Sequence, residues 1–419
     1  MSDLQPVRGT RDFYPEDMRF RNWLFDHFRE VARLFGFSEY DAPILENEEL
    51  YTRKQGEEIV AQLYAFEDKG GRKVSLRPEM TPSLARMVLA NTALPMPLKW
   101  FSIPQCWRYE RAMRGRKREH YQWNMDIWGV EGIEAEVELL SAIVTLFKRI
   151  GLDSTDVGIK INSRKILQQV LTNSGVTDEQ FTPVCIIVDK MDKLPQDVIE
   201  KELKEIGLNP EIIKTINDTL AIKSLTKLSE LLGEDSDAVN EISKMWNLAE
   251  EYGIDEWLVF DASIVRGLAY YTGIVFEAFD RSGELRAICG GGRYDTLLST
   301  FGGQDKPACG FGFGDVVIAE LLADKGIMPN LESGIDDVIF AFNSDLRSAA
   351  MNIASILRGK GRSVDLVLED RKMKWGFKHA NRAGAKRVVL LTPEEWSMGK
   401  IRVRDMTTGE EKDLDVNEL

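Results

Sequence analysis

The fold is decided by residues 105–131, QCWRYERAMRGRKREHYQWNMDIWGVE. Apolar and polar residues alternate at both ends of this stretch, and a basic loop with Gly115 at its turn lies between them. Alternation on both sides of a short loop predicts a β-hairpin. Because successive side chains of a strand point to opposite sheet faces, Gln122, Asn124 and Asp126 are expected to share one face.

The outgoing strand adds Arg108 and Glu110 along one of its faces. A sheet face with so many charged and amide groups makes a poor hydrophobic core and a suitable floor for a zwitterionic ligand. Residues 111–118 carry five cationic side chains in a chain of net charge -14, and arginine binds phosphate through two parallel hydrogen bonds. A solvated hairpin tip is the common alternative, but the polar face beside this loop favours phosphate binding.

Composition indicates a globular protein of two or three domains, since 43% of the 419 residues are hydrophobic and 29% are charged. No apolar run approaches the ~20 residues that span a bilayer, and residues 1–17 contain no apolar signal core. We therefore expect a cytoplasmic protein without membrane contact. Four distant cysteines and three histidines predict neither a disulfide framework nor a metal site held by the protein.

The N-terminal third contains two further patterns. Apolar residues recur at helical spacing over residues 20–35, with Gly36 as the stop, and a short strand at 37–42 runs into Pro43. A strand at 73–77 leads into the string Pro-Glu-Met-Thr-Pro, whose two prolines fix the backbone around Glu79 and Thr81. Capping of the following helix, residues 83–90, by Thr81 is the alternative interpretation.

The middle of the chain changes character. Residues 162–250 have a helical pattern rich in Lys, Glu, Leu and Ile, with few aromatics and no concentrated polar site, so they predict a helical insertion; its breaks are at Gly175, Pro195, Pro210 and Gly233. The string VRGLAYYTG at 265–273 precedes a strand at 274–279 and a hairpin into ICGGGRYD at 288–295. Three successive glycines permit close approach of a ligand to the backbone, although many such turns are only turns.

Two segments complete the chain. The string GFGFGD at 310–315 precedes a helical segment at 316–322 and lacks the spacing of a dinucleotide-binding fingerprint. From residue 336, strands at 337–342, 364–368 and 387–391 alternate with helices at 346–360 and 371–383, which indicates a small α/β domain. Arg371, Lys374 and Lys378 are expected on one helical face, either as a solvated surface or as an RNA contact.

These strings together resemble the class II aminoacyl-tRNA synthetases, and most closely the histidyl-tRNA synthetase family. The hairpin resembles motif 2, the helix and strand before Pro43 resemble motif 1, and residues 310–322 resemble motif 3. Arg-Gly-Leu-x-Tyr-Tyr at 266–271 and Gly-Gly-Gly-Arg-Tyr-Asp at 290–295 resemble signatures that separate this family from the prolyl, threonyl and glycyl enzymes. The resemblance spans nearly the whole chain.

The resemblance implies an α+β fold. Its class II antiparallel sheet, flanked by helices, would comprise residues 1–160 and 255–328, with a helical insertion at 161–254 and an α/β anticodon-binding domain at 335–419. It implies a homodimer through motif 1. It also implies ATP-dependent ligation of L-histidine to tRNA(His) through a histidyl-adenylate, with Mg²⁺ accompanying the ATP phosphates and Glu110 as its candidate contact.

The resemblance also assigns roles to individual residues. Arg108 and Arg266 would be catalytic, stabilising charge on the α-phosphate. Histidine would be bound by eight residues, namely Glu79, Thr81, Arg108, Gln122, Asp126, Arg266, Tyr270 and Tyr271. ATP would be bound by Arg108, Glu110, Arg118 and His120, and tRNA by Arg114, Arg116, Lys374 and Lys378.

The sequence departs from the family pattern at several positions. Val317 stands where most class II synthetases have the motif 3 arginine, so that Arg116 or Arg118 would neutralise the terminal phosphates or activation would be impaired. His120 stands in place of an adenine-stacking phenylalanine, and Asp126 in place of a longer glutamate. Met113 occupies a loop position where many bacterial members have glutamine.

Two other functions remain open from the sequence. A non-catalytic, synthetase-like regulatory subunit of histidine biosynthesis, which senses histidine, is favoured by the missing motif 3 arginine. The complete C-terminal domain and both arginines oppose it. A class II synthetase for another amino acid is opposed by the strings at 266–271 and 290–295.

Overall fold

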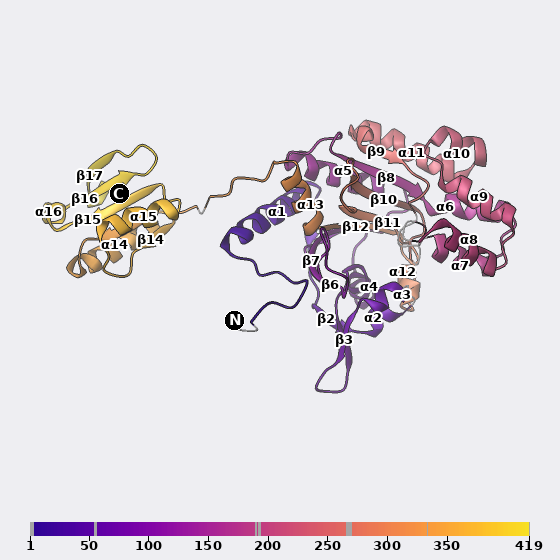
Figure 1. Ribbon diagram of the computed structural model, residues 1–419, viewed down its shortest axis with the longest axis horizontal. Coiled ribbons are helices and arrows are strands. Elements are labelled where there is room, and N and C mark those ends of the chain that lie inside the picture. The colour runs from indigo at the N-terminus through magenta and orange to yellow at the C-terminus, as the bar shows by residue number, and fades with distance from the viewer. Residues whose placement is uncertain are drawn as a thin grey trace. The chain divides into compact units, whose positions relative to one another are not determined.

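The computed structural model describes residues 4–53, 57–188, 191, 194–264, 270–332 and 334–418. The chain forms two compact units, Met1–Met328 and Pro329–Leu419, each with its own sheet and core (Figure 1). Arg266, one of the predicted catalytic residues, lies outside the described residues.

The first unit is built on a nine-stranded sheet in the order β1-β5-β7-β12-β11-β10-β8-β9, with β6 paired to β7 beside this path. Among the described strands of this sheet, only β1–β5 and β8–β9 pair in parallel. The bounds are β1 Ser38–Glu39, β5 Leu98–Ser102, β6 Gln105–Trp107, β7 Glu119–Trp128, β8 Val157–Ser163, β9 Leu258–Phe260, β10 Ile274–Asp280, β11 Cys289–Arg293 and β12 Ala308–Gly314. A smaller sheet contains β2 Leu45–Asn47, β4 Lys73–Leu76 and β3 Tyr64–Glu67.

Helices α1 (Pro15–Leu34) and α5 (Glu134–Arg149) cover one face of the large sheet. The side chain of Phe28 on α1 stacks on Trp123 of β7 with ring centroids 5.0 Å apart, deep in the main core. The helix begins five residues before the predicted start, because Pro15 has the fixed φ of a first helical position. It ends where Gly36 adopts a φ of 74°, as the sequence predicted.

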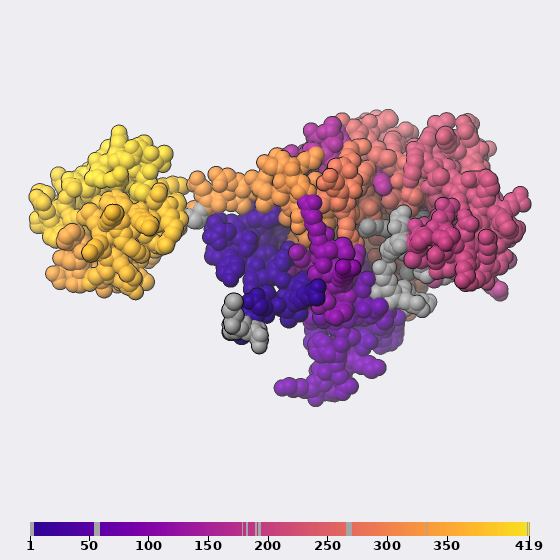
Figure 2. Space-filling view, in the orientation of Figure 1, coloured from indigo at the N-terminus to yellow at the C-terminus, as the bar shows by residue number. Residues whose placement is uncertain are grey.

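The helical prediction for the middle of the chain is confirmed. Its helices are α6 Arg164–Asn173, α7 Asp178–Val188, α8 Gln196–Glu205, α9 Pro210–Leu220, α10 Leu225–Leu232 and α11 Asp237–Tyr252. Helices α6–α9 share a separate hydrophobic core, whereas Leu228 of α10 and Ile242 of α11 belong to the core of the large sheet. In Figure 2 the helical segment is the magenta-to-pink lobe. Strand β8 runs to Ser163, so residues 161–163 belong to the sheet.

The predicted hairpin is confirmed, since Cys106 of β6 pairs with His120 of β7. The outgoing strand is shorter than predicted and ends at Trp107, so Arg108 and Glu110 lie in the loop. The reason is competition for backbone partners, because the N–H of Tyr109 donates to the carbonyl of Gln62, 2.7 Å away. The strand predicted at 37–42 is likewise limited to β1.

The remaining elements of the first unit are short helices that surround the sheet: α2 Glu49–Thr52, α3 Glu57–Ala61, α4 Thr81–Ala90, η1 Asp255–Trp257, α12 Leu297–Thr300 and α13 Asp315–Asp324. Helix α13 follows β12 directly, as predicted for the segment after the glycine-rich string.

The second unit contains a five-stranded sheet in the order β14-β13-β15-β16-β17. Its elements are β13 Asp337–Ala341, η2 Ser344–Leu346, α14 Arg347–Gly359, β14 Val364–Leu366, α15 Met373–Arg382, β15 Arg387–Leu391, α16 Pro393–Ser397, β16 Lys400–Asp405, β17 Glu411–Asp415 and η3 Val416–Glu418. The α/β prediction is confirmed, and β16 and β17 add an antiparallel pair that was not predicted. Helix α15 begins at Met373, after Arg371. The prediction that Arg371 shares a helical face with Lys374 and Lys378 is therefore wrong for Arg371.

Candidate active site

The polar face of β7 exists as predicted. Trp123, Met125 and Ile127 enter the main core, and the alternating residues Gln122, Asn124 and Asp126 point to the opposite face. Directly across from these three, β12 supplies Gly314, Gly312 and Gly310. The second strand therefore adds no side chains to this face, and backbone alone lies beside the polar groups of β7 on that strand.

The triple glycine of β11 has a different role. A methyl group on Gly291 would lie 2.6 Å from the Cβ of Phe311 and 2.7 Å from the ring of Phe276, both in the core. A methyl on Gly292 would meet the backbone of Val275 at 3.1 Å. The glycines predicted to admit a ligand therefore allow adjacent strands to pack with large core side chains.

Aromatic side chains lie around Asp126. The hydroxyl of Tyr294 donates a hydrogen bond to Oδ1 of Asp126, and the Tyr294 ring lies 6.2 Å from that of Tyr270 and 6.5 Å from that of Tyr271. Burial raises the pKa of Asp126 to about 7, and the bond from Tyr294 opposes this only in part. Tyr294 was not predicted as a site residue, although it lies in the quoted GGGRYD string.

Four buried polar atoms line the same region without a hydrogen-bond partner in the described part of the chain: Oδ2 of Asp126, Oδ1 of Asn124, Oγ of Ser102 and the hydroxyl of Tyr40. Ser102 on β5 lies directly across from Asn124, and the neighbouring pair joins Trp100 to Asp126. Buried polar groups without partners are costly. The unpartnered oxygens among these aromatic side chains are therefore chemically suited to a small ligand that offers N–H donors.

Glu79 and Thr81 lie at the junction of β4 and α4, both buried. The pKa of Tyr270 is raised first by burial and then by the charge of Glu79, the residue predicted to bind the ammonium group, so Glu79 acts on one of these aromatic side chains. Thr81 is the first residue of α4 and its side chain does not cap the helix, so the capping alternative was wrong. The Nε of Arg108 donates to the carbonyl of Pro78 at 2.9 Å and brings Arg108 to the same junction.

His120 lies on β7 among three arginines. Burial, followed by the charges of Arg108, Arg11 and Arg286, lowers the pKa of His120 to about 3, so the ring is neutral at physiological pH. Arg11 forms ion pairs with Glu119 at 2.7 Å and with Asp315 on α13 at 3.0 Å. Sequence reasoning missed Arg11 and Arg286, because both reach His120 from segments far away along the chain.

The hairpin loop carries its cations in pairs with carboxylates. Arg116 lies 2.6 Å from Glu110, and the Nε of Arg118 donates to the carbonyl of Glu110 at 3.1 Å. Arg114 contacts Glu320 and Asp324 of α13 at 3.1 and 2.6 Å. Each of these three predicted phosphate-binding or tRNA-binding cations thus has a partner within the protein.

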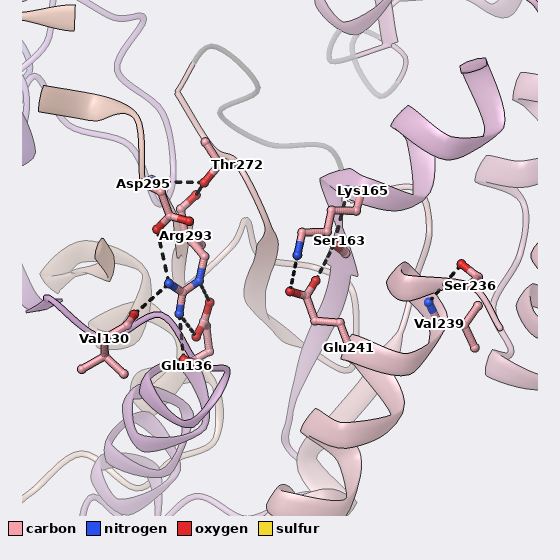
Figure 3. Close-up of polar contacts among 11 residues, drawn as sticks. Val130, Glu136, Ser163, Lys165, Ser236, Val239, Glu241, Thr272, Arg293 and Asp295 are labelled. Carbon is pink, nitrogen blue, oxygen red and sulfur yellow. Dashed lines mark hydrogen bonds and ion pairs between the residues drawn. The ribbon is translucent and has the colours of Figure 1, made fainter. Parts of the chain in front are cut away.

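Arg293 fastens the end of β11 (Figure 3). Its guanidinium binds Glu136 of α5 through two ion-pair contacts of 2.5 and 2.6 Å and donates to the carbonyl of Val130 at 2.9 Å. The backbone N–H of Thr272 donates to the carbonyl of Arg293, and the N–H of Asp295 donates to the Thr272 hydroxyl. This network holds Tyr294 and the segment that carries Tyr271 in one place.

No group of three or more His, Cys, Asp or Glu side chains in the described residues could hold a metal ion. The candidate contact for Mg²⁺, Glu110, instead pairs with Arg116. The residues present therefore do not build a protein-held metal site. Among the helices described, none is long and apolar enough to cross a membrane.

In the second unit, Lys374 and Lys378 are exposed on α15. Between them, Trp375 stacks on the ring of His379 at a centroid distance of 4.8 Å. Arg371, which precedes the helix, lies 5.2 Å from the centroid of Trp375. An exposed cationic surface beside stacked rings has the chemistry that single-stranded nucleic acids bind.

Comparison with known proteins gives a consistent result. The family described as histidyl-tRNA synthetase matches residues 9–314, and an anticodon binding domain matches residues 336–419. The chain is 54% identical over its full length to the chloroplastic and mitochondrial histidine–tRNA ligase of Arabidopsis thaliana, of which it covers 86%. It is 41% identical to the histidine–tRNA ligase of Opitutus terrae, with 99% of this chain and 96% of that protein covered.

A solved structure agrees with the fold. Histidyl-tRNA synthetase from Nostoc sp. PCC 7120 superimposes with a TM-score of 0.80 at 24% sequence identity, and the alignment covers 100% of this chain and 98% of that one. The predicted α+β fold, with a mostly antiparallel central sheet and a C-terminal α/β unit, is thereby confirmed. From its length, its sequence and its fold, the chain belongs to the histidyl-tRNA synthetase family.

Proposed function

We propose that this chain is a histidine–tRNA ligase that forms histidyl-adenylate from L-histidine and ATP and then acylates tRNA(His). The single observation that carries the proposal is the buried carboxylate of Asp126, with the bond from Tyr294 and an unpartnered Oδ2. An imidazole suits these surroundings because its N–H donates to a carboxylate while its ring packs on aromatic side chains.

In the first step, a carboxylate oxygen of histidine attacks the α-phosphorus of ATP and pyrophosphate leaves. Arg108 and Arg266 stabilise the charge that develops on the α-phosphate, a role worth on the order of a few kcal/mol each. Glu79 and Thr81 hold the ammonium group, and Gln122 with Tyr270 and Tyr271 completes the histidine site. Positioning carries the chemistry, because no side-chain nucleophile is needed.

ATP binding follows from the same face. The neutral ring of His120 supplies a stacking surface for adenine, and its pKa near 3 keeps it from repelling the neighbouring arginines. Arg118 and Glu110 of the loop lie beside the triphosphate. Mg²⁺ arrives as part of the ATP substrate, since its phosphate oxygens are the hard ligands that this ion prefers.

In the second step, the 3′ hydroxyl of the terminal adenosine of tRNA attacks the adenylate carbonyl and AMP leaves. The second unit binds the anticodon, with Lys374 and Lys378 as phosphate contacts, and Arg116 faces the acceptor end. We assign residues 1–160 and 255–328 to a class II catalytic domain, 161–254 to the insertion and 335–419 to anticodon binding. Helix α1 and strand β1 form a homodimer interface.

The regulatory-subunit alternative shares histidine binding and differs in chemistry. The observation in favour of that alternative is Val317, which stands where a phosphate-binding arginine is expected. The full-length identity to ligases and the matched anticodon binding domain favour ligation instead. We place the enzyme in the cytoplasm; a fluorescent fusion of the full chain that accumulated in an organelle would overturn that placement.

The decisive experiment is ATP–pyrophosphate exchange with purified protein, comparing histidine with proline, threonine and glycine. We expect exchange with histidine alone and its loss in Arg266→His. Histidine binding by calorimetry without exchange would overturn the ligase and support the sensor. Exchange with another amino acid would overturn the histidine assignment.

A further inference from the structure

The tip of the hairpin loop is attached to α13. The guanidinium of Arg114 contacts Oε2 of Glu320 at 3.1 Å through Nε and both carboxylate oxygens of Asp324, at 2.5 and 2.6 Å, through a terminal nitrogen. Glu320 and Asp324 are four residues apart on α13, and therefore lie on one face of the helix. One arginine thus spans two carboxylates more than 200 residues further along the chain.

A second contact lies beside the ionic one. Gly115 has a φ of 69° and is buried, and a methyl on it would lie 3.6 Å from Cγ2 of Val317. Val317 precedes Glu320 by three residues and shares its helix face, and the Val317 side chain is 7% exposed. The backbones of Met113 and Arg116 close the turn with hydrogen bonds of 3.0 and 3.1 Å. The tip therefore rests on an apolar seat with carboxylates at its edge.

The part of the loop after this tip, residues 116–118, leads to His120. Arg116 follows Gly115 directly and pairs with Glu110, and the N–H of Arg118 donates to the carbonyl of Gly9 at 2.8 Å. If the tip left α13, residues 116–118 would lose the support that the contacts of Arg114 and Gly115 with that helix provide. The attachment therefore governs where two cations lie relative to the nucleotide.

We propose that Arg114 is a positioning residue for adenylate formation, which with Glu320 and Asp324 anchors the hairpin tip to α13, and is not primarily a tRNA ligand. The inference rests on the proposed function and deepens it. It also gives Val317 a role, since the position without an arginine is the seat on which Gly115 packs. A long side chain there would lift the tip.

The anchor combines ion pairs with apolar packing. A single exposed ion pair contributes little, but an arginine fork held by two carboxylates has a defined geometry. The adjacent packing of Gly115 on Val317 fixes the tip against the helix. Because the pairs are partly exposed, salt screens them, so nucleotide affinity should weaken as ionic strength rises.

The test is ATP–pyrophosphate exchange without tRNA. For Arg114→Ala we expect the KM for ATP to rise about tenfold with the KM for histidine unchanged, because a loosened loop misplaces phosphate-binding groups. Glu320→Gln combined with Asp324→Asn should reproduce the effect, and adding Arg114→Ala to that pair should add little. Arg72→Ala, which removes an exposed ion pair with Asp68 outside this loop, is the matched control and should leave both constants near the wild-type values.

A second measurement is independent of activity. Hydrogen exchange of residues 113–118 should accelerate in Arg114→Ala and in the Glu320→Gln, Asp324→Asn protein, and not in Arg72→Ala. Arg114→Ala could instead show normal pyrophosphate-exchange kinetics without tRNA, unchanged hydrogen exchange and a loss confined to aminoacylation. That result would overturn the anchor and favour Arg114 as a tRNA contact. If the wild-type protein showed no pyrophosphate exchange, the proposed function would fail, and hydrogen exchange alone would still decide whether the tip is anchored.

Discussion

Gly310 lies directly across the sheet from Asp126, so close that any side chain on Gly310 would collide with Oδ1 of the carboxylate. The same methyl would also lie 2.8 Å from the carbonyl of Met125. The carboxylate therefore occupies space that only glycine on the neighbouring strand leaves open. The geometry of the proposed imidazole site depends on β12 as much as on β7.

Gly310→Ala is expected to abolish histidine-dependent activation while the protein still folds. The added methyl must push Asp126 away from Tyr294 or separate two paired strands. Gly312→Ala is the matched variant, because its methyl would lie 3.4 Å from Gln122, an ordinary contact. Calorimetric titration with histidine should show a loss of affinity of at least tenfold for the first variant and a smaller loss for the second. Equal losses would contradict the role of the collision.

Asp126→Asn should change the pH dependence of stability. Between its ordinary value of 3.8 and about 7, the Asp126 carboxyl is ionised in the unfolded chain and protonated in the folded one. The free energy of unfolding therefore falls as pH rises through this window, by roughly 1.4 kcal/mol per pH unit from this group. The asparagine variant lacks this term, so urea unfolding should show its stability relative to wild type rising across the window. Parallel curves for the two proteins would refute the raised pKa.

Removing one partner of the buried pair between Arg293 and Glu136 should be strongly destabilising. Arg293→Met leaves the Glu136 carboxylate, which is fully buried, without its partner, at a cost of about 3–5 kcal/mol in the free energy of unfolding. The exposed pair of Arg404 and Glu411 is the control, and Arg404→Met should cost about 1 kcal/mol or less. Urea unfolding of both variants checks the contrast, which similar costs would contradict.

Asn162 should act on catalysis from a distance. Its Nδ2 donates to the carbonyls of Ala262 and Ile264 at 2.9 Å each, just before the segment that carries Arg266. Asn162→Asp keeps the size and loses both donors, so we expect kcat for pyrophosphate exchange to fall about tenfold or more, with the KM for histidine changed less. Thermal unfolding should confirm a folded protein. A changed KM with normal kcat would place the effect in substrate binding instead.

The sequence predicted what neighbouring residues determine. Alternation located the hairpin, helical spacing located α1, and the polar face of β7 followed from a period of two. It did not reveal the partner of Arg114 on α13, the pairing of Arg293 with Glu136 on α5, or the approach of Arg286 to His120. Each of these joins residues more than 150 positions apart, and a residue pattern contains no information about which distant side chain will arrive.

The end of the outgoing strand, just before Arg108 and Glu110, shows the same limit over a shorter range. Their residue pattern is that of a strand, but the neighbouring backbone of Tyr109 bonds to Gln62 outside the hairpin, and the ladder stops. The triple glycine was interpreted as a place where a ligand approaches the backbone, because the sequence shows only that side chains are missing there. The aromatic side chains of Phe276 and Phe311, which need the space, determine its actual use.

Helices α6–α9 have their own core, whereas α11 packs on the large sheet, and Oγ of Ser163 at the end of β8 donates to Glu241 of α11 at 3.2 Å. Strands β8 and β9 are parallel neighbours, which need a crossover between them, and α11 provides it. Helices α6–α9 are therefore the part of this protein that a foreign helical module could replace. A chimera that grafts a foreign helical module should keep α11 in place, since moving it would open the sheet on which the proposed adenylate site is built.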